Sequence, residues 1–169
     1  MTRSRTLAFC SLVAAFLGGN AIVAAHAWRF THFVGSGEKT ASPEDLTIGG
    51  RVLVALTGVV VPRPSVGRLP ADVGLAAVST VEAGVSTWTV AGSGRGTALM
   101  FHGYGGTKSD LLDEAAVLNA HGWTTVLVDF PGSGESPGST TSLGWAEAEV
   151  VAGLAEARDE GRLVLFGKS

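Results

Sequence analysis

The sequence predicts an α/β domain with a mostly parallel sheet, preceded by an apolar membrane helix. Short apolar runs without alternation recur in the second half of the chain, helical patterns separate them, and glycine-rich loops follow them. Strands that alternate with helices in this way pair in parallel through right-handed crossovers. The chain has 169 residues, 46% of them hydrophobic and 16% charged, which is enough for one domain with a sizeable core.

The N-terminus has the pattern of a membrane anchor or of a secretory signal. Arg3 and Arg5 precede an apolar stretch over 7–25 that is interrupted only by small or weakly polar residues and Asn20. This length suits a bilayer span and favours an uncleaved anchor, while the small-x-small site Ala25-His26-Ala27 is typical of a signal peptide that is removed. With the arginines on the inner side, we expect the body outside the cytoplasm, or secreted if the signal is cleaved.

We divide the chain into a signal anchor or signal peptide (1–27), a membrane-proximal segment and linker (28–70), and the α/β domain (71–169). In the second part, Ser42 and the acids after it predict a helix over 42–56 that ends at Gly58, although Gly49-Gly50 weakens it by about 1–2 kcal/mol. We expect this helix to cap the domain, with the membrane surface as the alternative location. The prolines at 62–64 indicate a linker.

The domain begins with a predicted antiparallel hairpin of strands over 75–81 and 85–90. Ser109 is the expected cap of the first helix, which Gly122 ends, and Gly161 ends the second. The remaining elements are buried strands over 97–101, 124–128 and 163–166, and helices over about 109–121 and 142–160.

Each of the three parallel strands ends in a loop with the residues of an active site. Ligands bind at the carboxyl ends of such strands. The glycines of the loop over 102–106 allow backbone N–H groups to face a reacting oxygen, and such donors contribute about 3–4 kcal/mol each in acyl transfer. A second glycine-rich loop covers 129–136. The third, Gly167-Lys168-Ser169, is the start of Gly-x-Ser-x-Gly, a sharp turn that presents a nucleophilic serine.

Other functions fit the sequence less well. Gly167-Lys168-Ser169 ends like a Walker A loop, but the first glycine is missing at Arg162 and a strand fills the interval. Gly132-Ser133-Gly134 misses the dinucleotide fingerprint by one position. A net charge of −3 without a basic stripe argues against a nucleic-acid partner, and the lone Cys10 excludes a disulfide framework and a cysteine-rich metal site. We expect no metal and no organic cofactor.

Together, the three loops resemble the α/β-hydrolase superfamily in content, order and approximate spacing. This resemblance rests on His102-Gly103-Tyr104-Gly105, Asp129-x-Pro131-Gly132-x-Gly134-x-Ser136 and Gly167-x-Ser169. The N-terminal part, with the apolar anchor, His26-Ala27-Trp28 to Thr31-His32-Phe33 and Leu56-Thr57-Gly58 to Pro62-Arg63-Pro64, is similar to bacterial membrane-anchored hydrolases of the serine aminopeptidase and esterase branches. The resemblance of the loops implies the N-terminal half of an α/β-hydrolase fold, with an antiparallel N-terminal hairpin.

The resemblance also implies residue roles. Ser169 would be the nucleophile and the backbone N–H of Tyr104 an oxyanion donor, supported by His102, Gly103 and Gly105. The acid and histidine of this fold follow the serine, whereas all four histidines here precede it, so both would lie beyond the chain. Asp129 would fix its loop, and Lys168 would fill the variable position of the turn.

The implied function is that of a serine hydrolase. It would act on an ester, thioester or amide bond of a small molecule or peptide through an acyl-enzyme, incompletely in this chain. The alternative is a catalytically inert fragment or truncated gene product of such a hydrolase. Without its anchor we expect the chain to be poorly soluble, because a parallel sheet with an apolar edge tends to aggregate.

Overall fold

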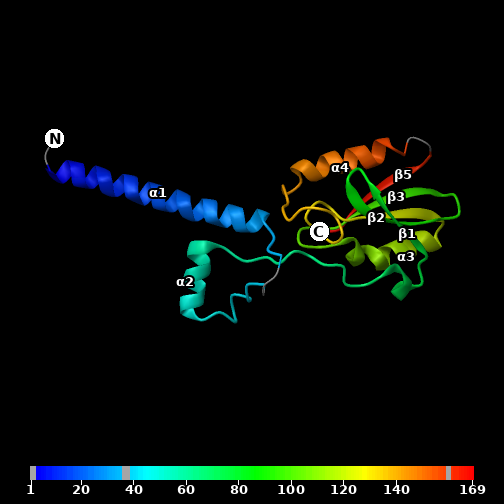
Figure 1. Ribbon diagram of the computed structural model, residues 1–169, viewed down its shortest axis with the longest axis horizontal. Coiled ribbons are helices and arrows are strands. Elements are labelled where there is room, and N and C mark those ends of the chain that lie inside the picture. Colours follow the sequence, from blue (N-terminus) through cyan, green and yellow to red (C-terminus); the bar gives the residue numbers. More distant parts are fainter. Residues whose placement is uncertain (1–2, 36–38, 159–160) are drawn as a thin grey trace.

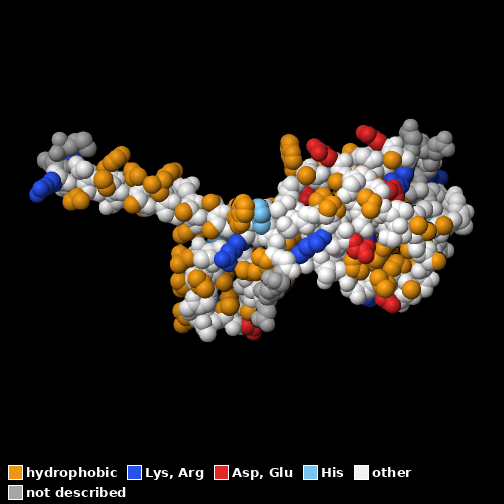
Figure 2. Space-filling model, in the orientation of Figure 1, with side chains coloured by type: hydrophobic (Ala, Val, Ile, Leu, Met, Phe, Trp, Pro, Cys, Tyr) orange, Lys and Arg blue, Asp and Glu red, His pale blue; other side chains and the backbone are white. Residues whose placement is uncertain are grey.

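The computed structural model describes residues 3–35, 39–158 and 161–169. A long N-terminal helix, α1 (Arg3–Thr31), projects from an α/β domain, and a short helix, α2 (Ile48–Thr57), lies beside the end of α1 and away from the sheet (Figure 1). α1 has 29 residues and a hydropathy of 2.0, and the spanning part of it is 0% buried, so it has the length and composition to cross a membrane. Apolar side chains stud its surface, with Lys or Arg near its start (Figure 2).

The predicted helix over 42–56 begins later, at Ile48. Residues 43–45 form a turn in which the N–H of Asp45 donates to the carbonyl of Ser42, and the hydroxyl of Thr47 caps the helix by accepting from the N–H of Gly50 at 3.1 Å. Gly49 and Gly50 therefore lie in the first turn, where fewer helical hydrogen bonds depend on them. Gly58 ends the helix as predicted, with φ of 83°.

The expectation that this helix caps the domain is wrong, because α2 packs against α1. Gly58 approaches α1 so closely that a Cβ there would lie 3.1 Å from the Cα of His26. The imidazole of His26 bonds to the carbonyl of Ala55 at 2.9 Å, and Arg29 donates to the carbonyl of Gly58. The outer face of α2 remains exposed, including Ile48, Val52, Leu53 and Leu56.

The sheet confirms the predicted α/β fold. Its strands are β1 (Ala77–Glu82), β2 (Val85–Val90), β3 (Gly96–Phe101), β4 (Trp123–Val128) and β5 (Leu163–Gly167), in the order β1-β2-β4-β3-β5. β3 pairs in parallel with both β4 and β5, while β1 and β2 form an antiparallel hairpin that continues antiparallel onto β4. The three parallel strands therefore bring their carboxyl ends to one edge.

Helices cover both faces of this sheet. A 3₁₀ turn (Lys108–Leu111) leads into α3 (Leu112–Ala120), and α4 (Trp145–Glu156) lies on the opposite face (Figure 1). Successive residues of β3 alternate between the two faces. Thus Met100 packs with Leu112 and Ala115 under α3, whereas Leu99 and Phe101 pack with Leu154 of α4.

The predicted starts of both helices are wrong. Ser109 lies inside the 3₁₀ turn, whose N-cap is Thr107, and the carboxylate of Asp110 accepts the N–H of Thr107 at 2.8 Å as in a capping box. α4 begins at Trp145, three positions after Ser142, because Leu143 and Gly144 have φ of 58° and 112° and cannot continue a helix. The predicted end is also wrong, since α4 ends at Glu156, before residue 160, which itself lies outside the described residues.

Candidate active site

The loops after β3 and β5 touch through their backbones at the edge where the parallel strands end. The N–H of Lys168 donates to the carbonyl of Phe101 at 2.9 Å, so the hydrogen bonding between β3 and β5 extends to the start of the two loops. A Cβ on Gly103 would lie 2.8 Å from the carbonyl oxygen of Lys168 and 3.1 Å from the Cα of Ser169. Only glycine permits this approach, which sets Ser169 beside the loop over 102–106.

Lys168 itself points away from the other loops. Its ammonium donates to the carbonyl of Asp110 at 2.9 Å and to the carboxylate of Glu114 at 2.7 Å. This hydrogen bond from Lys168 is the main reason why the pKa of Glu114 is below its ordinary value. The pair fastens the end of β5 to the start of α3.

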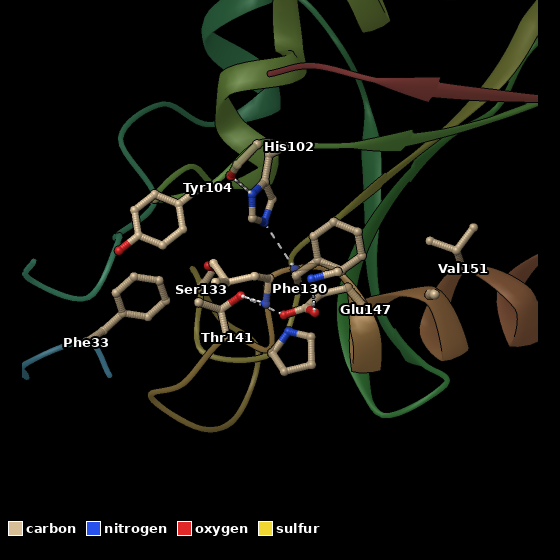
Figure 3. Close-up of a pocket in the computed structure, with 14 residues that line it drawn as sticks. Phe33, His102, Tyr104, Phe130, Ser133, Thr141, Glu147 and Val151 are labelled. Atoms are coloured by element: carbon tan, nitrogen blue, oxygen red, sulfur yellow. Dashed lines mark hydrogen bonds between the residues drawn. The ribbon is translucent and has the colours of Figure 1, made fainter. Parts of the chain in front are cut away.

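His102 joins the loop after β3 to the loop after β4. The backbone N–H of Phe130 donates to its Nε2 at 3.1 Å, and its Nδ1 bonds to the carbonyl of Gly103 at 2.8 Å, so the proton resides on Nδ1 (Figure 3). Burial lowers the pKa of His102, although the Gly103 carbonyl and Asp129 oppose the effect. The ring is therefore neutral at pH 7, with both nitrogens occupied.

Tyr104 connects the same loop to the end of α1. Its ring stacks on Phe30 with centroids 4.4 Å apart, and its hydroxyl donates to the carbonyl of Phe30 at 2.7 Å. Phe33 approaches from the same side, with its ring centroid 5.8 Å from that of Tyr104. Among the described residues, no hydrogen bond has the backbone N–H of Tyr104 as its donor.

An ion-pair cluster of the buried Lys108 and Asp129 with the half-exposed Glu135 supports these loops. The ammonium of Lys108, whose side chain is fully buried, lies 3.1 Å from the carboxylate of Asp129 and 2.6 Å from that of Glu135. Asp129 also accepts the N–H groups of Lys108 and Glu135 at 2.7 and 2.9 Å. The carboxylate thereby fixes the loops after β3 and β4 relative to each other.

The loop after β4 is further held by Arg63 from the segment predicted as a linker. Its guanidinium donates to the carbonyls of Gly132, Gly134 and Ser136, at 3.4 and 3.1 Å for the two glycines. The linker is thus ordered along this loop. No local pattern in the sequence predicts these hydrogen bonds, because the partners of Arg63 lie about 70 positions away.

Glu147 of α4 holds the loop that precedes its own helix. Its carboxylate accepts the hydroxyls of Thr141 and Ser142 and the N–H groups of Ser142 and Gly144. Burial alone would raise the pKa of Glu147, but the hydrogen bonds from Ser142, Thr141 and the backbone outweigh it and lower the pKa to about 2. The sequence showed this residue only as one helical acid among several.

These loops enclose an apolar cavity of about 420 Å³ (Figure 3). Of the predicted site residues, His102, Gly103, Tyr104 and Gly105 line it, whereas Ser169 lies beside Gly103 and is not a lining residue. Apolar walls come from Phe33, Phe130, Pro131, Leu143 and Val151. Phe33 was not anticipated as a site residue. Within the described parts of the chain, no three His, Cys, Asp or Glu side chains are grouped to hold a metal ion.

No protein-family model and no curated protein sequence matches the chain. Three crystal forms of the Pyrococcus furiosus esterase Pf2001 match its fold, with TM-scores of 0.55, 0.53 and 0.51 and identities of 18, 21 and 16%. Each match covers 63% of this chain and 47, 45 or 44% of the esterase, so the chain spans about half of the length of these structures. The similarity shows that the domain has an α/β-hydrolase fold.

Proposed function

We propose that this domain is the nucleophile-bearing part of a membrane-anchored serine hydrolase that cleaves an ester, thioester or amide bond. The observation that carries the proposal is the backbone contact between Gly103 and Ser169 at the ends of two neighbouring parallel strands. The esterase that shares the fold is consistent with this chemistry.

In the proposed reaction, the hydroxyl of Ser169 gives its proton to a general base and attacks the substrate carbonyl, and the alcohol, thiol or amine leaves with that proton. Water then hydrolyses the acyl-enzyme and releases the acid. The backbone N–H of Tyr104 stabilises the oxyanion, and Gly103 and Gly105 keep side chains out of its way. His102 acts as a brace because its Nε2 already accepts the N–H of Phe130. In the α/β-hydrolase fold, the general base and its acid follow the nucleophilic serine in chain order.

The test is labelling by a fluorophosphonate probe of the protein expressed from its complete gene. We expect the wild type to be labelled and Ser169→Ala to remain unlabelled, since the probe reacts with an activated serine. Ser79→Ala, on the exposed face of β1, is the matched control and should be labelled like the wild type. Equal labelling of Ser169→Ala and wild type would refute the role of Ser169. A stop codon directly after residue 169 in the gene would favour the inert product instead.

Retention of α1 as an anchor is part of the same proposal. The segment Ala25-His26-Ala27 is helical, and α2 packs on it through Gly58 and Ala55, so cleavage there would remove contacts of the folded protein. We expect the protein to stay in the membrane fraction after carbonate extraction at full mass, with the domain accessible from outside the cytoplasm. A mature N-terminus near residue 28 would show that the helix is a cleaved signal.

A further inference from the structure

We infer that the segment directly after α1, with Phe33, forms one wall of the substrate pocket, and that this pocket takes the apolar chain of an ester which enters from the bilayer that holds α1. The inference deepens the proposed function and rests on it for the bond that is cleaved. The position of the wall does not depend on the chemistry, because it follows from the contacts of Phe30 and Phe33.

The end of α1 is attached to both rims of the pocket. On one side, Phe30 stacks on Tyr104 and accepts its hydroxyl. On the other, the N–H of Phe33 donates to the carbonyl of Ser139 at 2.7 Å, and the N–H of Thr141 donates to the carbonyl of Thr31 at 2.9 Å. The side chain of Phe33 is only 5% exposed as a result. It faces the cavity next to Tyr104 (Figure 3).

The interior of the pocket suits an alkyl or acyl chain. Two of its polar side chains are already engaged, since both nitrogens of His102 have backbone partners and the carboxylate of Glu147 accepts four hydrogen bonds. The side chains of Phe33, Phe130 and Leu143 offer only van der Waals contact. A cavity of about 420 Å³ with such walls falls in the range of small-molecule sites.

The pocket also lies close to the expected membrane surface. Phe33 follows Ala25, the end of the apolar stretch, by eight residues, and the first six of these lie in α1, which adds about 9 Å of helix. The headgroup layer is about 5–8 Å thick on each side of a bilayer, so Phe33 lies close to its outer boundary. At the mouth, Leu143 is 54% exposed and the neighbouring Trp145 is 84% exposed, and Trp side chains favour this interfacial depth. α4 begins at the end of the domain that faces α1 (Figure 1).

The test is photocrosslinking of the complete membrane protein in phosphatidylcholine vesicles. The vesicles contain a dodecyl ester with a diazirine at the end of its chain, and mass spectrometry maps the modified residues. We expect crosslinks at Phe33, Phe130 and Leu143, and more than about tenfold weaker labelling by the matching butyl ester, because it buries fewer methylene groups. Crosslinks confined to 3–27, or equal labelling by both esters, would overturn the inference.

Two variants of α4 provide a matched pair. Ala148 lines the cavity from an exposed position, so Ala148→Trp should fill the pocket and reduce labelling at Phe33 about tenfold without disturbing the core. Ala146→Trp, on the same helix and exposed but not among the lining residues, should label like the wild type. Equal labelling of both variants would contradict a chain in this cavity.

The result is separable from the hydrolase proposal. Ser169→Ala should retain the crosslinks, since Ser169 is not a lining residue. Crosslinks without fluorophosphonate labelling would support the pocket and refute the chemistry, and the reverse pattern would refute only the pocket. Release of the protein by carbonate would refute entry from the bilayer.

Discussion

The backbone of Ser169 lies against Gly103, close enough that a methyl group on Gly103 would stand 3.1 Å from the Cα of Ser169. The contact joins residues that are far apart in sequence, and it arises because β3 and β5 are neighbours in the sheet. It makes the spacing of the two loops sensitive to the size of residue 103.

Gly103→Ala should therefore reduce fluorophosphonate labelling of the complete protein by about 10–100-fold, since displacements of about 1 Å cost this much in positioned reactions. Circular dichroism should show an unchanged fold. Gly153→Ala is the control: its added Cβ meets only Ala83 at 3.8 Å, and an alanine within α4 should leave labelling intact. Full labelling of Gly103→Ala would show that this contact does not determine the position of Ser169 in the site.

Lys108→Met should destabilise the domain by about 3–5 kcal/mol, because it leaves the buried carboxylate of Asp129 without its cation. Urea denaturation of the complete protein measures the free energy of unfolding. Glu135→Gln is the matched comparison, since Glu135 is half exposed and such pairs contribute less than about 1 kcal/mol. A loss below about 1 kcal/mol for Lys108→Met would contradict the role of the cluster.

Acid should loosen the loop before α4 through Glu147. The pKa of this carboxyl is about 2 in the folded protein against an ordinary value of 4.5, so its stabilisation is complete above pH 4.5 and is lost as pH falls towards 2. Fluorescence of Trp145 and amide exchange over 141–144 should report the change. Glu147→Gln should remove this pH dependence and expose the loop at neutral pH; an unchanged profile would argue against the prediction.

His102 should titrate below its ordinary pKa of 6.5, because burial disfavours the cation. The folded protein binds this proton less readily than the unfolded chain, so His102 contributes stability above pH 6.5 that declines as pH falls through its lowered pKa. An NMR titration of the ring carbon protons provides the measurement. A pKa at or above 6.5 would contradict the buried neutral brace.

The domain separated from residues 1–27 should be poorly soluble. β5 forms an edge of the sheet, with Val164 and Leu165 exposed, and an apolar edge strand promotes association. Light scattering and thermal unfolding of 28–169 test this expectation. A soluble monomer with a sharp, cooperative transition would contradict it.

The sheet could be predicted from the sequence because its signals are local. The buried strands are continuous apolar runs, and Gly122 marks where the helix before β4 stops, whereas α4 ends at Glu156, five positions before Gly161. The first residues of the helices were harder to predict from the sequence. The hydroxyl of Ser109 resembles a cap, but the actual starts depend on Thr107 with Asp110 and on the positive φ of Leu143.

Only part of the candidate site could be predicted from the sequence, because some of its contacts are not local. The glycine-rich loops after β3 and β4 have a composition that indicates a site, and residues of both loops line one cavity. The contributions of Phe33 and Arg63 depend on contacts across about 70 residues, which no window of sequence reveals. The role of Ser169 stays a prediction.

α1 continues as one helix from Arg3 to Thr31 and is then fastened to the domain within two residues. This short connection prevents the domain from rotating freely relative to α1. With α1 as the proposed membrane anchor, the orientation of the domain would follow the tilt of this helix, and the domain would search for substrate by diffusion in two dimensions.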